Sequence, residues 1–201
     1  MTGHMGERRN RAVALVTDDF RLYHRLVPFL ESHGIHVLGL RSHDPVPASV
    51  QVLLGGPAGD PRSLPLHDDL EATLLAAFRR LDRRPGRDGY RHVVLGVDPG
   101  KVTGLAVVAD GLTLLVGEAL SVEDAVERLS HWAAGLAMPN LEVHIGAGAP
   151  RVGRDLLARL ARRLPGAKVS LVREEATTPG SHVTGSRHTD AAVHIALREP
   201  L

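Results

Sequence analysis

The stretch HVVLGVDPGKVTGLAVVADGLTLLVGE, residues 92–118, holds three apolar runs joined by two short turns. The first run ends in Asp98-Pro99-Gly100, and Asp110-Gly111 joins the second run to the third. Aspartate followed by glycine between apolar runs is typical of a β-hairpin. The stretch therefore predicts three consecutive strands, each antiparallel to its neighbour.

Helices and strands alternate after these three strands. Ser121 and Asp124 form a capping box that predicts a helix to about Gly135. Apolar runs and leucines at helical spacing then predict a strand at 141–146, a helix at 152–164, a strand at 168–174 and a final helix from about His188. Because helices connect the later strands, these run parallel to the first. The order βββαβαβα predicts an α/β domain with a mixed five-stranded sheet and helices on both faces.

The first half of the chain predicts a smaller α/β domain. Pro85 and two glycines in RRPGRDG, residues 83–89, interrupt the pattern and are typical of a domain boundary. We therefore expect a small βαββα domain over 12–85 and the larger domain over 86–201, while residues 1–11 are interpreted as a tag or disordered start. The smaller domain's strands are predicted at 12–16, 35–40 and 50–56, and its helices at 20–33 and 68–81.

Composition excludes several classes of protein. Aromatic residues make up only 3% of the chain, which argues against binding of single-stranded nucleic acid by rows of stacked rings. The chain has no cysteine, which excludes disulfides and thiolate zinc sites. No apolar run reaches about 18 residues, so we expect no membrane association and a cytoplasmic location.

Carboxylates from distant segments are predicted to meet at one edge of the larger sheet. Asp98 ends the first strand, Glu174 and Glu175 end a strand predicted parallel to it, and Asp190 lies in the first turn of the last helix. Ligands bind at this edge in open α/β sheets. Carboxylates without thiolates suit Mg²⁺ or Mn²⁺, and two such ions can hydrolyse a phosphodiester. The alternative is that Asp98 forms a turn and Asp190 caps a helix.

The segment VVLGVDPGKVTGLAVV, residues 93–108, resembles the opening motif of the RuvC/YqgF branch of the RNase H-like nucleases. In that family a hydrophobic strand ends in Asp-Pro-Gly and a Thr-Gly pair begins the next strand. VREEATTP at 172–179 is similar to the family's acidic-strand motif, and HTDAAVHIAL at 188–197 to its final helix. The resemblance spans about residues 91–198 and implies an RNase H-like fold.

The resemblance also implies a function and a set of site residues. It implies a metal-dependent endonuclease that hydrolyses branched DNA, such as Holliday junctions, or structured RNA. Nucleic acid is then the partner, and a homodimer is an alternative to a monomer. Two Mg²⁺ or Mn²⁺ ions would be held by Asp98, Glu174 and Asp190, with Glu175 and His194 as alternates. His188 is the implied catalytic histidine, and the implied nucleic-acid contacts are Lys101, Arg151, Arg154 and Arg187.

Three other interpretations stay open or are set aside. Gly146 stands where the resolvases carry a glutamate, so the alternative is a non-catalytic nucleic-acid-binding module with a degenerate RNase H-like metal site. An actin-like ATPase would need a second similar domain, for which the chain after residue 90 is too short. Asp18-Asp19 resembles the acidic pocket of response-regulator receivers, but strand 50–56 ends in glycines where a phosphoacceptor aspartate is needed. A helix N-cap is therefore the expected role of that pair.

Overall fold

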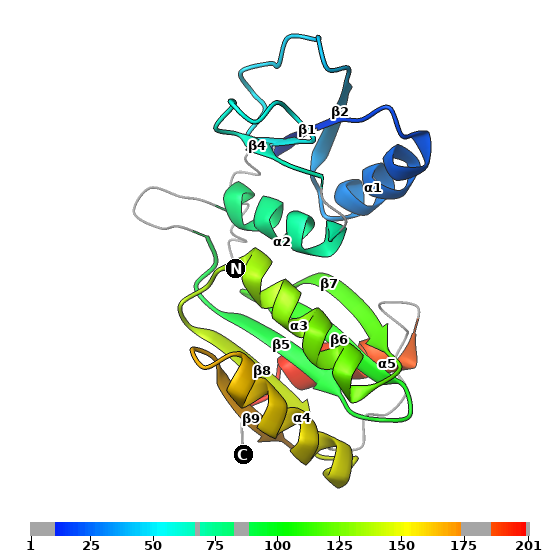
Figure 1. Ribbon diagram of the computed structural model, residues 1–201, viewed down its shortest axis with the longest axis vertical. Helices are drawn as coiled ribbons and strands as arrows, with labels where there is room; N and C mark the ends of the chain where they lie inside the picture. The colour runs from blue at the N-terminus through cyan, green and yellow to red at the C-terminus, as the bar shows by residue number, and fades with distance from the viewer. Residues whose placement is uncertain (1–10, 67–68, 83–88, 174–185, 200–201) are drawn as a thin grey trace, which may run out of the picture. The chain divides into compact units, whose positions relative to one another are not determined.

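The computed structural model describes residues 11–66, 69–82, 89–173 and 186–199 (Figure 1). The chain divides into an N-terminal unit, residues 1–89, and a C-terminal unit, residues 90–201. The former carries a four-stranded sheet and the latter a five-stranded sheet, which confirms the predicted mixed α/β class. Within the described ranges, no helix combines the length and the apolar character needed to cross a membrane.

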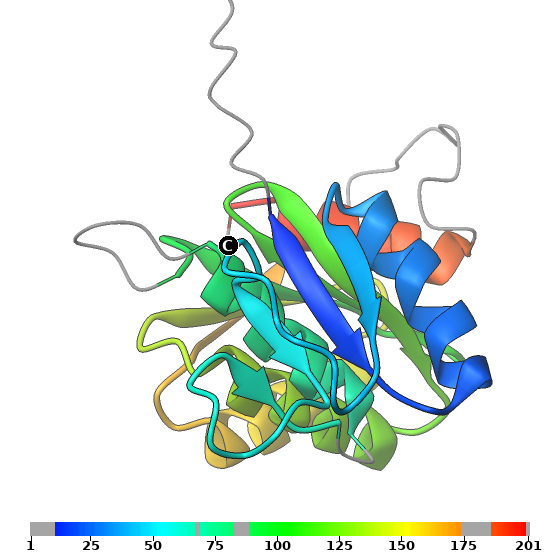
Figure 2. The same ribbon diagram turned by 90° about the horizontal axis from the view of Figure 1, so that it is seen from above.

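The N-terminal sheet is entirely parallel, with the strand order β2-β1-β3-β4. Figure 2 shows β1 and β2 side by side and pointing the same way. The two helices of this unit meet through the rings of Phe29 and Phe78, whose centroids are 6.1 Å apart. The elements are β1 (Ala12–Val16), α1 (Phe20–Ser32), β2 (His36–Leu40), β3 (Val52–Leu54), β4 (Ser63–Leu64) and α2 (Leu70–Leu81).

Two strand predictions for the N-terminal unit are wrong. The strand expected over 50–56 is only β3, because Gly55 follows it with a φ of +76° and turns the chain out of the sheet. The strand β4 was missed, because two residues between Arg62 and Pro65 show no alternation of apolar and polar side chains. The unit is therefore βαβββα rather than βαββα.

The C-terminal unit has the strand order β7-β6-β5-β8-β9. As predicted, β6 is antiparallel to β5 and to β7, while β8 and β9 continue the sheet in parallel. Figure 1 shows α3 and α4 in front of this sheet and α5 behind it. The elements are β5 (Val93–Asp98), β6 (Thr103–Ala109), β7 (Leu112–Ala119), α3 (Val122–Leu136), β8 (Leu141–Gly146), α4 (Pro150–Arg163), β9 (Lys168–Val172) and α5 (Arg187–Ala196).

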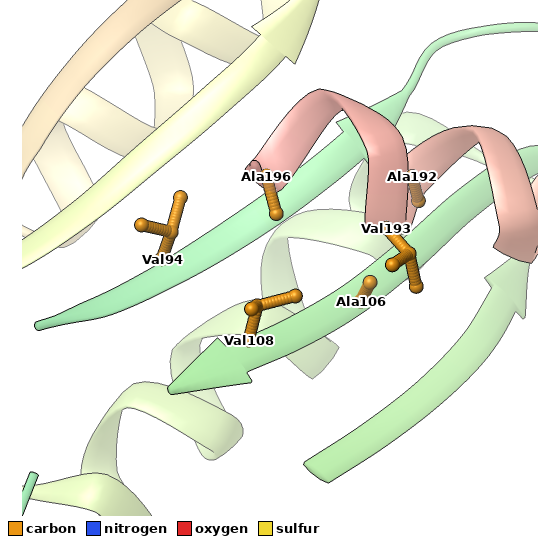
Figure 3. Close-up of a cluster of buried hydrophobic side chains, with 6 residues drawn as sticks. All are labelled: Val94, Ala106, Val108, Ala192, Val193 and Ala196. Carbon is orange, nitrogen blue, oxygen red and sulfur yellow. The ribbon is translucent and has the colours of Figure 1, made fainter. Parts of the chain in front are cut away.

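Helix α5 packs against β5 and β6 through small side chains. A Cβ at Gly96 would lie 2.0 Å from the carbonyl oxygen of Ala192, and a Cβ at Gly104 would lie 1.9 Å from that of His188. Only glycine therefore allows the helix backbone to come this close to the sheet. Around these contacts the two layers bury a small apolar cluster, shown in Figure 3, of Val94, Ala106, Val108, Ala192, Val193 and Ala196.

Candidate functional site

Two carboxylates lie on one face of the C-terminal sheet at the carboxyl end of β5. Asp98 is paired with Gly104 on β6, and Gly104 is paired with Glu118 on β7. Residues paired across strands project from the same face of a sheet. The glycine between the two carboxylates leaves room there for the first turn of α5.

The first turn of α5 holds His188 beside Asp98. The Nδ1 atom of His188 lies 3.8 Å from Oδ2 of Asp98, and both side chains are partly exposed. Ser186 caps the helix, since its hydroxyl accepts a hydrogen bond from the backbone N–H of His188 at 3.3 Å. The same hydroxyl donates a hydrogen bond to Glu118, which ties the helix start to β7. This edge therefore presents an imidazole and two carboxylates, groups that exchange protons or hold a polar ligand.

The structure brings only part of the predicted metal set together. Asp98 lies near His188, and Asp190 occupies the first turn of α5 as expected. Glu174 and Glu175 lie outside the described residues. Among those that are described, no three His, Asp or Glu side chains form a group that could hold a metal ion. Binding of Mg²⁺ or Mn²⁺ therefore stays a prediction.

The basic residues proposed as nucleic-acid contacts are exposed but scattered over several elements. Lys101 lies in the turn between β5 and β6, Arg151 and Arg154 lie in the first turns of α4, and Arg187 begins α5. His194, the alternate metal ligand, is exposed in the last turn of α5. Nothing in their geometry selects a ligand.

A second candidate site lies in the N-terminal unit, at the end of the sheet where β1 and β3 finish. The Oδ1 atom of Asp19 accepts hydrogen bonds from the backbone N–H groups of Arg21 at 2.8 Å and Leu22 at 3.2 Å. Asp19 is therefore the N-cap of α1, as predicted from the sequence. Its neighbour Asp18 is exposed.

Gly55, which directly follows β3, lies against the end of β1. A Cβ at Gly55 would lie 2.3 Å from the carbonyl oxygen of Val16 and 2.8 Å from Cδ1 of Leu66. Its backbone N–H donates to the carbonyl oxygen of Leu64 at 2.9 Å, which fixes the turn. No side chain, and so no carboxylate, fits at position 55 without moving the backbone of β1.

A further set of polar side chains lies at the other end of the C-terminal sheet, where β5, β8 and β9 begin. It was not predicted from the sequence. Oε1 of Glu142 lies 3.2 Å from Nε2 of His92, and Oε2 lies 3.3 Å from Nε2 of His144 and 3.8 Å from Nζ of Lys168. The spacing of Glu142 and His144, two residues apart on one strand, was the signal that they share a face.

Three neighbouring groups favour the charged form of Glu142. Burial alone would raise the pKa of this carboxyl, but the hydrogen bonds from His92 and His144 and the charge of Lys168 outweigh it and lower the pKa. We call Glu142, His92, His144 and Lys168 the Glu142 cluster.

Comparison with known proteins finds a match in one part of the chain. Residues 12–77 match the family of response regulator receiver-like domains. The matched range begins with β1 and ends within α2, so it contains the whole parallel sheet of the N-terminal unit. No curated protein matches the chain.

This match overturns the placement in the RuvC/YqgF nucleases and the nuclease function that it implied. The matched family is a receiver-like one, and nothing matched supports Holliday-junction cleavage, DNA repair or a degenerate version of that site. The fold itself accounts for part of the 93–108 motif that carried the resemblance. Pro99-Gly100 forms the turn after β5, and Gly104 makes room for α5. Enzymatic activity and contact with nucleic acid stay predictions.

Proposed function

We propose that this protein acts in signalling, through a receiver-like unit that binds a partner without being phosphorylated. The match of residues 12–77 to receiver-like domains supports a signalling role. The parallel order β2-β1-β3-β4, with an acidic pair directly after β1, is consistent with that match.

The environment of Gly55 carries the second half of the proposal. A receiver is phosphorylated on an aspartate at the end of its third strand, beside the acidic pair. Here that position is glycine, and the carbonyl oxygen of Val16 fills the space a side chain would need. The carboxylate of Asp19 is also engaged, since it caps α1. The position that would be phosphorylated holds no carboxylate, so we infer that the signal passes by binding.

Exposure to a phosphate donor tests the absence of phosphorylation. The full-length protein would be incubated with acetyl phosphate and Mg²⁺ beside a receiver that has its aspartate, and both would be analysed by intact mass. We expect phosphate on the control receiver only. Phosphate mapped to Asp18, Asp19 or any other residue of 12–77 would refute the proposal.

A photo-crosslinking experiment tests the binding. Phe20 is 78% exposed beside the acidic pair, and Leu112 is 55% exposed in the C-terminal unit, so the two positions form a matched pair for a photoreactive phenylalanine. We expect position 20, and not position 112, to capture one signalling protein that mass spectrometry identifies in the native cell. Capture of no protein at position 20, or of the same proteins at both positions, contradicts the proposal.

A further inference from the structure

The C-terminal unit contains a pocket of about 350 Å³ at one end of its sheet. Asp98 lies at the other end. The pocket lies where β5, β8 and β9 begin and where α5 ends, because His92, Glu142, Lys168 and Leu197 all contribute to its lining. Pockets of this size hold small organic molecules. All of the lining residues belong to the C-terminal unit, so the pocket does not depend on the receiver-like unit.

One wall of the pocket is apolar. It is formed by side chains from two neighbouring strands and from the end of α5, namely Val94, Val108, Ala196 and Leu197. Leu197 is 58% exposed, so much of its apolar surface is open to a ligand. A ligand that covers this wall removes apolar surface from water and gains free energy in proportion to the area buried.

The other wall is the rest of the lining, which is polar and consists of the Glu142 cluster together with Asp110, Gly111, Arg198 and Glu199. Within the cluster, Lys168 has unused capacity for an anion. The two oxygens of Glu142 already accept from the imidazoles of His92 and His144. Nζ of Lys168 is 3.8 Å from Oε2 of Glu142, beyond hydrogen-bond distance, and the Lys168 side chain is 68% exposed. The ammonium can therefore turn to an incoming negative group without giving up a hydrogen bond to Glu142.

Buried polar atoms in and beside this wall also lack partners. His144 is 2% exposed and lines the pocket, and its Nδ1 has no hydrogen-bond partner among the described residues. The hydroxyl of Ser170, paired with His144 on the neighbouring strand, has none either. Buried polar groups without partners are rare in folded proteins and often mark a place where a ligand or an ordered water binds.

We propose that this pocket binds a small organic acid, with its carboxylate on Lys168 and its apolar body against Val94, Val108 and Leu197. Lys168 would repel a cationic ligand, and two of the carboxylates that line the pocket are engaged: Glu142 by the imidazoles, and Asp110 by the backbone N–H groups of Arg91 and His92. It also disfavours a metal ion, since the described residues contain no group of three suitable ligands. A neutral ligand would gain no charge-assisted hydrogen bond from Lys168.

Titration of the full-length protein with matched probes tests this inference. Butyrate and benzoate would be compared with butanol and benzyl alcohol, which have the same apolar bodies without the charge, and with Zn²⁺. Binding would be followed by calorimetry and by the NMR signals of the histidine rings. We expect the two acids to bind and to shift the resonances of His92 and His144, while the alcohols bind at least about tenfold more weakly, as expected for loss of a charge-assisted hydrogen bond.

The chain offers a matched pair of variants, because its only lysines are Lys101 and Lys168. Both are exposed, and they lie at opposite ends of the strands of one sheet, Lys101 after the end of β5 and Lys168 at the start of β9. Lys168→Met should weaken benzoate binding between about threefold and tenfold, and Lys101→Met should leave it unchanged. Equal affinity for benzoate and benzyl alcohol, an unchanged affinity in Lys168→Met, binding of Zn²⁺ alone, or no binding of any acid would each overturn the proposal.

Discussion

The carbonyl oxygen of His188 lies directly above Gly104, at the place where any other residue would carry its Cβ. The distance from that Cβ position to the oxygen is only 1.9 Å, far inside van der Waals contact. This contact sets the height of the first turn of α5 above the sheet. It thereby places the imidazole of His188 3.8 Å from the carboxylate of Asp98.

The substitution Gly104→Ala should push α5 away from the sheet and separate His188 from Asp98. Overpacking of a filled interface costs about 1–3 kcal/mol, and we expect that loss in urea-induced unfolding. Gly166→Ala is the matched control, because a Cβ there meets nothing within 4 Å. If Gly104→Ala unfolds at the same urea concentration as the unchanged protein, the close approach of α5 is not what stabilises this unit.

Removal of the N-cap of α1 should destabilise the N-terminal unit. Asp19→Ala leaves the backbone N–H groups of Arg21 and Leu22 without their acceptor, at a cost of about 1 kcal/mol. Asp19→Asn keeps the accepting oxygen and should retain most of the stability. Asp18→Ala should have little effect, because Asp18 is exposed and does not cap the helix. Thermal unfolding measures all three, and equal losses in Asp18→Ala and Asp19→Ala would contradict the assignment of the cap.

The ion pair between Asp60 and Arg62 should make the N-terminal unit less stable in acid. The hydrogen bonds from the side chain and backbone of Arg62 lower the pKa of Asp60 from 3.8 to about 2. A carboxyl whose pKa is lowered by folding adds stability above its unfolded pKa of about 4, and the contribution is lost as the pH falls towards 2. In Arg62→Gln the pKa of Asp60 should return towards 3.8, as measured by carbon-detected NMR titration.

The control for this titration is Arg41→Gln, because Arg41 is exposed and its side chain does not pair with Asp60. A pKa of Asp60 that stays near 2 in Arg62→Gln would mean that another group holds the charge.

Divalent-cation binding at Asp98 can be measured directly. If the prediction from the sequence is right, calorimetry with Mn²⁺ should give sub-millimolar binding that is lost in Asp98→Asn and in Asp190→Asn, because carboxylate oxygens are the ligands this ion prefers. Asp155→Asn on α4 is the control, since Asp155 is occupied by Arg159 at 2.8 Å. Absence of heat with the unchanged protein would end the cation hypothesis.

Local pattern was sufficient to predict most elements of the fold. The Asp110-Gly111 turn, the Ser121 cap and the buried run of β5 each carry their signal within a few residues, and each is found where it was expected. The two-residue strand β4 has no such signal, because its place in the sheet comes from pairing with Leu53 and Leu54. Pairing between distant segments does not leave a pattern in either one.

The candidate sites were harder to predict for the same reason. His92, Glu142 and Lys168 are separated along the chain and meet only because Val94 pairs with Glu142 and Glu142 pairs with Lys168. In the sequence, Gly55 in place of a phosphoacceptor aspartate argued against a receiver-like interpretation. That glycine bears on chemistry at the strand end, whereas the match to receiver-like domains extends over the whole range 12–77. One position was therefore a poor guide to what the whole segment resembles.

The place of α5 in the chain has a consequence for biosynthesis. Strands β5, β6 and β7 are made first and can pair as they leave the ribosome, because Val93 reaches its antiparallel partner Ala109 after a short loop. Among the elements that the structure describes, it is α5, the final helix of the order, that covers their face with Gly96 and Gly104. We therefore expect the nascent C-terminal unit to expose an apolar face until α5 is translated.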